Sequence, residues 1–331
     1  MATKPKIPAF IGTKFGKSAK GARVGVFSAP HGTPYRGIDN RVHAGSGDAY
    51  RLAMAGDAEW ISHYDFDFGG PLVSPDFKAV DLGNLPTKSA DGAGNRKKIE
   101  TQTRNILNEG AVPFMFGGDD SVPVPFIAGF SGGPAITIVQ IDAHIDWRDD
   151  RLSERMGFSS TMRRASEQAH VWRIVQAGAR GLGSARQEEV DVALKWGAHL
   201  VTSRDIHEQG VATVLQHIEP DSDCLISLDL DVLDSSEMPA VAYPSPGGLS
   251  FVQLSALLAD VAAKARIAGF AMVEFVPKRD LTGTSAFTAG KIATLMMGHL
   301  ARQKPALVSR SCGLIGRRRS RQRQSRAHMQ H

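Results

Sequence analysis

The stretch AITIVQIDAHID, residues 135–146, joins an apolar run directly to a set of polar side chains. Its first part, Ala135–Ile141, is rich in β-branched residues and predicts a strand buried on both faces of a sheet. Asp142, His144 and Asp146 then follow at a spacing of two, and alternate residues of an extended chain point to the same side. The stretch therefore predicts a buried strand that ends in converging metal-ligand types.

A second apolar run, Cys224–Leu228, ends in the same way, with Asp229 and Asp231. Together the two stretches offer four carboxylates and one imidazole, which suit one or two divalent cations. Without a cation, such charges repel each other and lose their hydration. The alternative is a buried salt-bridge network, for which only Arg148 and Arg151 lie nearby in sequence. We therefore predict a metal site that serves hydrolysis.

Short apolar runs alternate with helical stretches along the chain, which predicts an α/β fold on a mainly parallel sheet covered on both faces. In such sheets ligands bind beyond the carboxyl ends of the strands. Both acidic clusters fall there, as do GGDDS at 117–121 and Glu274. The expected strands are Arg23–Ser28, Val112–Phe116, Ala135–Ile141, Val171–Ala177, Ala198–Thr202, Cys224–Leu228 and Phe270–Phe275; the expected helices are Asp48–Ala55, Lys97–Asn108, Gln187–Lys195, Gly210–Ile218, Phe251–Arg266 and Ser285–Gln303.

The body, residues 21–304, is predicted to be a single domain, because no linker or internal repeat interrupts it. Residues 1–20 and 305–331 are predicted to be extensions. The net charge is +5, yet seven arginines and no acidic residue follow from Arg310 onward, so 32 basic side chains face 34 acidic ones in the rest of the chain. The basic tail is expected to be disordered, and a solvated tail is favoured over nucleic-acid binding.

The composition is that of a soluble globular protein, with 42% hydrophobic and 22% charged residues. No apolar stretch approaches the ~20 residues that span a bilayer, so no membrane partner is expected. The first residues, MATKPKIPAF, contain no apolar signal core. The two cysteines, Cys224 and Cys312, exclude a disulfide framework and favour a reducing cytoplasm.

Four motifs in this order resemble the ureohydrolase family of arginases, agmatinases and their relatives. They are GGDDS at 117–121, DAHID at 142–146, SLDLDVLD at 227–234 with PGGL at 246–249, and VEFVP at 273–277. The stretch APHGTPYR at 29–36 resembles the agmatinase branch. The resemblance covers about residues 22–303. It implies an arginase-like three-layer α/β/α sandwich, often a trimer or hexamer, with a dinuclear manganese centre.

The resemblance also implies a role for each site residue. A hydroxide ion held between two divalent metal ions, Mn²⁺ or alternatively Ni²⁺, would attack the guanidino carbon of a small substrate, and Asp146 would receive its proton. Glu274 would pair with the cationic guanidinium, and His31 is a candidate substrate contact, although a solvated loop histidine is the favoured interpretation. The implied metal ligands are Asp120, Asp142, His144, Asp146, Asp229 and Asp231, with Asp142 and Asp229 bridging.

Three departures from the family pattern bear on activity. Asp120 and Phe158 stand where relatives usually have a metal-binding and a proton-carrying histidine. Residues 235–245 also differ from the usual family sequence after Asp234. Two hypotheses follow. The chain is an agmatinase-like hydrolase that releases urea and an amine from a guanidino compound. Alternatively, it is a catalytically weak partner subunit of a heteromeric ureohydrolase, such as a metformin-hydrolase-type assembly that acts on guanidine or biguanide substrates.

Overall fold

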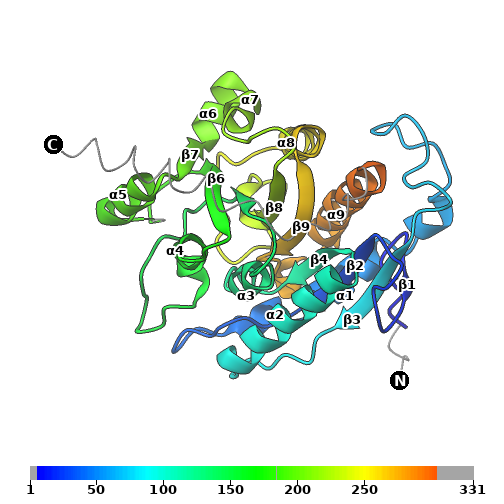
Figure 1. Ribbon diagram of the computed structural model, residues 1–331, viewed down its shortest axis with the longest axis horizontal. Coiled ribbons are helices and arrows are strands. Elements are labelled where there is room, and N and C mark those ends of the chain that lie inside the picture. Colours follow the sequence, from blue (N-terminus) through cyan, green and yellow to red (C-terminus); the bar gives the residue numbers. More distant parts are fainter. Residues whose placement is uncertain (1–5, 184, 304–331) are drawn as a thin grey trace.

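The computed structural model describes residues 6–183 and 185–303, which form three layers with a sheet between two sets of helices (Figure 1). The sheet has nine strands in the order β1-β3-β2-β4-β9-β8-β5-β6-β7, and neighbouring strands pair in parallel. The predicted three-layer α/β/α fold is thus confirmed. The strands are β1 (Lys14–Phe15), β2 (Val24–Ala29), β3 (Ala79–Asn84), β4 (Val112–Gly117), β5 (Ile136–Ile141), β6 (Val171–Ala179), β7 (His199–Thr202), β8 (Asp223–Asp229) and β9 (Arg266–Val273).

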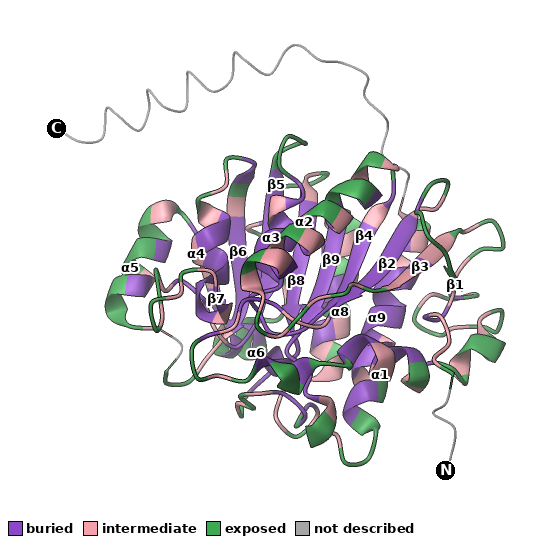
Figure 2. Cartoon of the chain, turned by 90° about the horizontal axis from the view of Figure 1, so that it is seen from below, coloured by how far each residue is buried: buried purple, intermediate pink, exposed green. Residues whose placement is uncertain are grey.

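Helices cover the sheet on both faces and bury a separate hydrophobic core on each. One core contains residues of α1, α8 and α9, and the other contains residues of α2, α3 and α4. Figure 2 shows the strands buried between helices whose outer sides are exposed. The helices are α1 (Ser46–Ala53), α2 (Gly92–Asn108), α3 (Pro123–Ala128), α4 (Thr161–Ser166), α5 (Gln187–Trp196), α6 (Ser203–Gln209), α7 (Ala212–Leu215), α8 (Phe251–Lys264) and α9 (Thr284–Arg302).

The seven predicted strands are all present, with ends that differ by up to four residues, but β1 and β3 were missed. The sequence of β3, AVDLGN, places Asp81 and a glycine inside the strand, so it lacks the apolar run that marks the others. The short helices α3, α4 and α6 were missed as well, since six or seven residues give too little helical periodicity.

Part of the segment that was expected to be an extension, residues 1–20, packs against the domain. Phe10 and Ile11 are buried in the core on the α1 side, and Ala19 is buried on the other side. β1 adds an edge strand to the sheet by pairing with β3. The apolar side chains of this segment therefore anchor it to the domain. The predicted basic tail, residues 305–331, lies outside the described residues.

No helix in the described part of the chain is long and apolar enough to cross a membrane. The surface helix α2 exposes one side to solvent, and its buried residues recur along the other side. This amphipathic pattern is what a helix covering a sheet requires.

A buried ion pair ties α1 to β3. The Arg51 guanidinium donates to both carboxylate oxygens of Asp81, at 2.7 and 2.8 Å, and both side chains are almost fully buried. Asp81 also accepts from the backbone N–H of Phe10 at 2.9 Å. The pair therefore secures both the edge strand β3 and the segment that leads into β1.

Replacing Arg51 by alanine is expected to lower the free energy of unfolding by about 3–5 kcal/mol, because Asp81 would keep a buried charge without its partner. Chemical denaturation measures this loss. Arg41→Ala is the control, since Arg41 pairs with Asp39 on the exposed surface and its removal should leave the denaturation midpoint unchanged. Equal midpoints for Arg51→Ala and the control would contradict the prediction.

Candidate metal centre

The candidate ligands gather because four neighbouring strands end at the same edge of the sheet. β4, β9, β8 and β5 are adjacent in that order. Asp120 follows β4, Glu274 follows β9, Asp229 ends β8 and Asp142 follows β5. Since parallel strands share one carboxyl edge, residues that are up to 154 positions apart in sequence come into contact there.

Asp142, His144 and Asp231 form a first group of potential ligands, with ligand atoms all within 4.8 Å of one another. His144 Nδ1 lies 3.1 Å from Asp231 Oδ2 and 3.4 Å from Asp142 Oδ1. Burial lowers the pKa of His144, but the hydrogen bonds to these two carboxylates outweigh it and raise the pKa to about 12. The group therefore attracts positive charge strongly.

Asp120, Asp142 and Asp229 form a second group under the same distance limit, and Asp142 belongs to both groups. Both carboxylate oxygens of Asp120 are buried and have no hydrogen-bond partner. Burial, together with the charges of Asp146 and Asp142, raises the pKa of Asp120 well above its ordinary value. Oxygen atoms buried in this way call for a cation, so the donor set fits a second metal ion.

Asp146 is joined to the cluster through Gln140, whose Nε2 donates to Asp142 Oδ2 at 2.8 Å and to Asp146 Oδ2 at 2.7 Å. The backbone of Asp146 lies in the left-handed region, at φ 50°. Its carbonyl oxygen accepts from the N–H groups of Met162 and Arg163 in α4, which hold it there. Backbone strain of this kind is common at functional sites.

A chain of hydrogen bonds behind the ligands was missed from the sequence. Trp147 Nε1 donates to Gln176 Oε1 at 2.6 Å, and Gln176 Nε2 donates to Gln140 Oε1. These bonds fix the orientation of the Gln140 amide and so of the two carboxylates that it contacts. A signal was present, because Gln140 is a polar residue in a buried strand and lies two positions before Asp142, on the same side.

Glu274 lies beside the cluster with its backbone also in the left-handed region, at φ 71°. Its Oε1 accepts from the backbone N–H of Asp120 at 2.8 Å, and His43 Nε2 lies 3.6 Å from its Oε2. Burial raises the pKa of Glu274 to about 7, although the nearby His43 opposes this shift. His43 was missed, since it lies in a 3-10 turn with no sequence motif around it.

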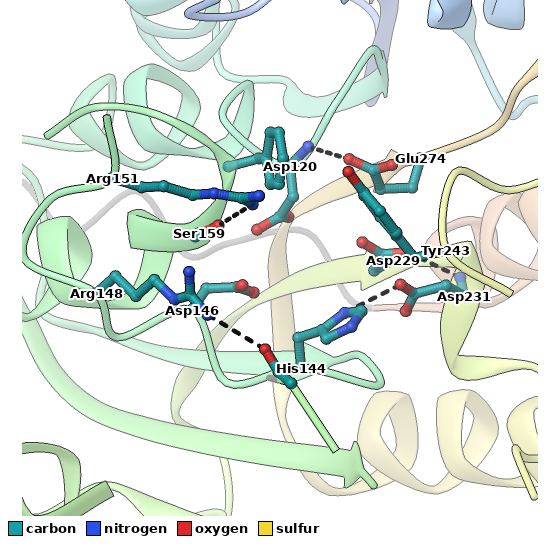
Figure 3. Close-up of a pocket in the computed structure, with 12 residues that line it drawn as sticks. Asp120, His144, Asp146, Arg148, Arg151, Ser159, Asp229, Asp231, Tyr243 and Glu274 are labelled. Carbon is teal, nitrogen blue, oxygen red and sulfur yellow. Dashed lines mark hydrogen bonds and ion pairs between the residues drawn. The ribbon is translucent and has the colours of Figure 1, made fainter. Parts of the chain in front are cut away.

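The candidate site residues other than Asp142 and His31 line one cavity of ≈ 190 Å³ (Figure 3). Its lining combines acidic side chains with Arg148, Arg151, Phe158 and Tyr243. His31 is not among the lining residues, and its Nδ1 is hydrogen-bonded to Thr87 Oγ1 at 3.0 Å. The full lining is Asp120, His144, Asp146, Arg148, Arg151, Phe158, Ser159, Gly183, Asp229, Asp231, Tyr243 and Glu274.

The alternative of a buried salt-bridge network is not supported by the contacts of Arg148 and Arg151. Among the described residues, no ion pair within 4.0 Å joins either arginine to the acidic cluster. Arg148 Nε instead lies 4.0 Å from Glu189, and its Nη2 donates to the carbonyl oxygen of Gly183 at 3.2 Å. The carboxylates therefore lack the basic partners that such a network needs.

Arg180 joins the loop of residues 235–245 to the turn that carries Asp231. The Arg180 Nη2 donates to the carbonyl oxygens of Asp231 at 2.7 Å and Ser245 at 2.8 Å, and its Nε donates to that of Pro246 at 3.2 Å. These bonds join the turn that carries a ligand to the loop that carries Tyr243. Asp234 secures the same loop, since its Oδ2 accepts from the N–H of Gly247 at 2.7 Å.

Comparison with known proteins identifies the family of this chain. The sequence model of the arginase family matches residues 24–298. An agmatinase of Pyrococcus horikoshii is 28% identical over 255 residues, which cover 76% of this chain and 83% of the relative.

Two solved structures share the fold. The proclavaminate amidino hydrolase from Streptomyces clavuligerus superposes with a TM-score of 0.75 at 24% identity, covering 91% of this chain and 99% of that chain. The Trypanosoma cruzi formiminoglutamase with Mn²⁺ superposes with a TM-score of 0.70 at 20% identity, covering 86% and 95%. Because the family model matches most of the chain, this protein belongs to the arginase family of metal-dependent hydrolases, which cleave amidino C–N bonds.

Proposed function

We propose that this protein hydrolyses a small guanidino compound to urea and an amine, in the manner of an agmatinase. The observation that carries the proposal is the position of Glu274, a buried carboxylate beside two groups of potential metal ligands that share Asp142. A carboxylate in that place suits a cationic guanidinium. The relative named agmatinase, at 28% identity, supports the same reaction.

Two divalent cations, Mn²⁺ or alternatively Ni²⁺, fit the donor set of carboxylate oxygens and one imidazole. When bound, they would supply a water molecule acidified for attack on the guanidino carbon. Asp142, which belongs to both ligand groups, and Asp229, which belongs to the second, would help to hold them. The remaining ligands proposed are His144 and Asp231 for one ion and Asp120 and Asp146 for the other.

The residues of the chain then bind, orient and move protons. Glu274 accepts hydrogen bonds from the substrate guanidinium and turns its carbon toward the ligands. Asp146 takes up the proton of the attacking water. Because Phe158 has no exchangeable proton, we assign the protonation of the leaving nitrogen to Asp146 as well. In sum, one C–N bond is broken by one water, the oxygen becomes that of urea, and the amine leaves with the proton.

The alternative is a catalytically weak partner subunit, and it is favoured by Asp120 and Phe158, which replace two histidines. Such a subunit would act only within a heteromer, on a guanidine- or biguanide-type substrate. The homo- or hetero-oligomeric state, trimer or hexamer, stays a prediction, as does the cytoplasmic location.

Metal stoichiometry separates the two hypotheses. Purified protein loaded with Mn²⁺ or Ni²⁺ is expected to hold close to two ions per chain by elemental analysis, and Asp120→Ala close to one, because Asp120 contributes oxygens to only one group. Asp39→Ala, which removes an exposed carboxylate, should leave the stoichiometry unchanged. One ion or fewer in the wild type, with urea released only after co-expression with a sister chain, would favour the partner subunit.

Metal removal should destabilise the protein more at high pH. Burial raises the pKa values of Asp120, Asp142, Asp146 and Asp229 above the ordinary 3.8. The metal-free folded state then binds protons more tightly than the unfolded state, so its stability falls as pH rises above about 4. Ionised carboxylates are also what a metal binds. Thermal unfolding at pH 5 and pH 8, with Mn²⁺ or with chelator, should show the larger metal effect at pH 8; an equal effect at both would contradict it.

Glu274→Gln is expected to lower kcat/KM for urea release by about 10–100-fold, because it removes a charge-assisted hydrogen bond to the guanidinium. The bound metal should stay as in the wild type, since Glu274 is not a proposed ligand. The matched control is Glu208→Gln on the exposed side of α6. A lower metal content in Glu274→Gln would show that this carboxylate acts as a ligand instead.

A further inference from the structure

We propose that the substrate carries a carboxylate at the end opposite its guanidino group, and that Arg151 binds this carboxylate. The inference rests on the proposed function for the guanidino end and specifies the chemistry of the far end. The substrate class is then a guanidino acid, rather than a guanidine with a cationic amine tail.

Arg151 differs from the other arginines of its region because it has no acidic partner. Arg155, Arg163 and Arg164 all lie within 4.0 Å of Asp149 or Glu167. No ion pair of the described residues includes Arg151, whose Nη1 makes only a long hydrogen bond of 3.5 Å to Ser159 Oγ. Its side chain is half-buried and lines the cavity (Figure 3). A partly desolvated guanidinium of this kind favours an anion as its partner.

Two aromatic rings hold the guanidinium in place. Arg151 Cζ lies 5.6 Å from the ring centroid of Tyr35 and 5.5 Å from that of Phe158, and the two rings meet edge to face at 4.7 Å. Tyr35 is fixed in turn, because its hydroxyl oxygen accepts from the backbone N–H of Ser159 at 3.1 Å. Contact with ring faces leaves the N–H donors of an arginine free for a bidentate carboxylate. Phe158 therefore serves here as a support for a cation.

The charges of the cavity are arranged for a molecule with unlike ends. Arg151 and Glu274 lie on opposite sides of Asp120 in the cavity, and Tyr243 also lines the space (Figure 3). A cationic tail would meet Arg151 as a like charge and be repelled, whereas an anionic tail would be attracted. Arg148 offers less to such a tail, because its guanidinium already contacts Gly183 and Glu189.

The reaction on a guanidino acid balances without a further reactant. One water adds to the guanidino carbon, the bond from that carbon to the chain nitrogen breaks, and the nitrogen leaves protonated. The products are urea and an amino acid. The carboxylate at the far end is unchanged, so Arg151 acts in binding and positioning alone.

Three probes test the inference with the full-length, metal-loaded protein: 4-guanidinobutanoate, agmatine and 1-butylguanidine. They share a guanidino group and a four-carbon chain but end in an anion, a cation and a methyl group. Calorimetric binding and urea release should favour the anionic probe over the neutral one by about tenfold or more, with agmatine weakest. Arg151→Gln should weaken the anionic probe about 10–100-fold and change the neutral probe less than about twofold.

Arg155→Gln is the matched control, because it removes the same charge from the same loop outside this cavity, and it should preserve the order of the probes. Arg151→Lys keeps the charge and should retain part of the preference. Equal binding of the three probes, or equal losses for all three in Arg151→Gln, would overturn the inference. Urea release from agmatine alone would overturn it and leave the proposed function standing. Binding of the anionic probe that depends on Arg151, with no urea released from any probe, would support the inference and contradict the proposed function.

Discussion

The five aspartates of the candidate metal centre lie buried at the carboxyl edge of the sheet, and the repulsion among their charges is the constraint that the surrounding structure meets. Backbone N–H groups stabilise part of this negative charge. The N–H of His144 donates to Asp142 Oδ1 at 2.6 Å, and the N–H of Ala143 donates to Asp231 Oδ1 at 3.1 Å. The Gln140 amide stabilises more of the negative charge, because it donates to the carboxylates of both Asp142 and Asp146. What remains, above all the two oxygens of Asp120, requires cations, and the β4-β9-β8-β5 order gathers these groups where cations can reach them.

Asp120 and Phe158, the two positions at which the family resemblance led us to expect histidine, have different surroundings. Asp120 belongs to a ligand group and adds a negative charge to the candidate centre. Phe158 has no exchangeable proton, and its ring packs against the guanidinium of Arg151. Asp120 adds a negative charge to the cavity lining, and Phe158 packs beside the cation that Arg151 adds to the same lining.

The sequence was most informative where a short-range rule decides the outcome. The spacing of Asp142, His144 and Asp146 predicted that strand ends would carry the site, and the alternation of apolar runs and helical stretches predicted the sheet. β3 could not be predicted from the sequence, because its buried Asp81 pairs with Arg51 and no local pattern indicates this partner. The contacts of Arg151 depend on how residues 35 and 158 meet in space, so its position could not be predicted. His31, a candidate substrate contact, stays a prediction; its Nδ1 lies 3.0 Å from Thr87 Oγ1.

The contacts of Arg180 have a consequence for how this fold diversifies. Every oxygen that its guanidinium contacts belongs to the main chain, including those of Asp231, Ser245 and Pro246. Main-chain oxygens persist whatever side chains the loop acquires, so substitutions at residues 235–245 leave the attachment intact. The substrate wall can therefore change by mutation while Asp231 keeps its position, and a new specificity can arise without the loss of the inherited metal centre.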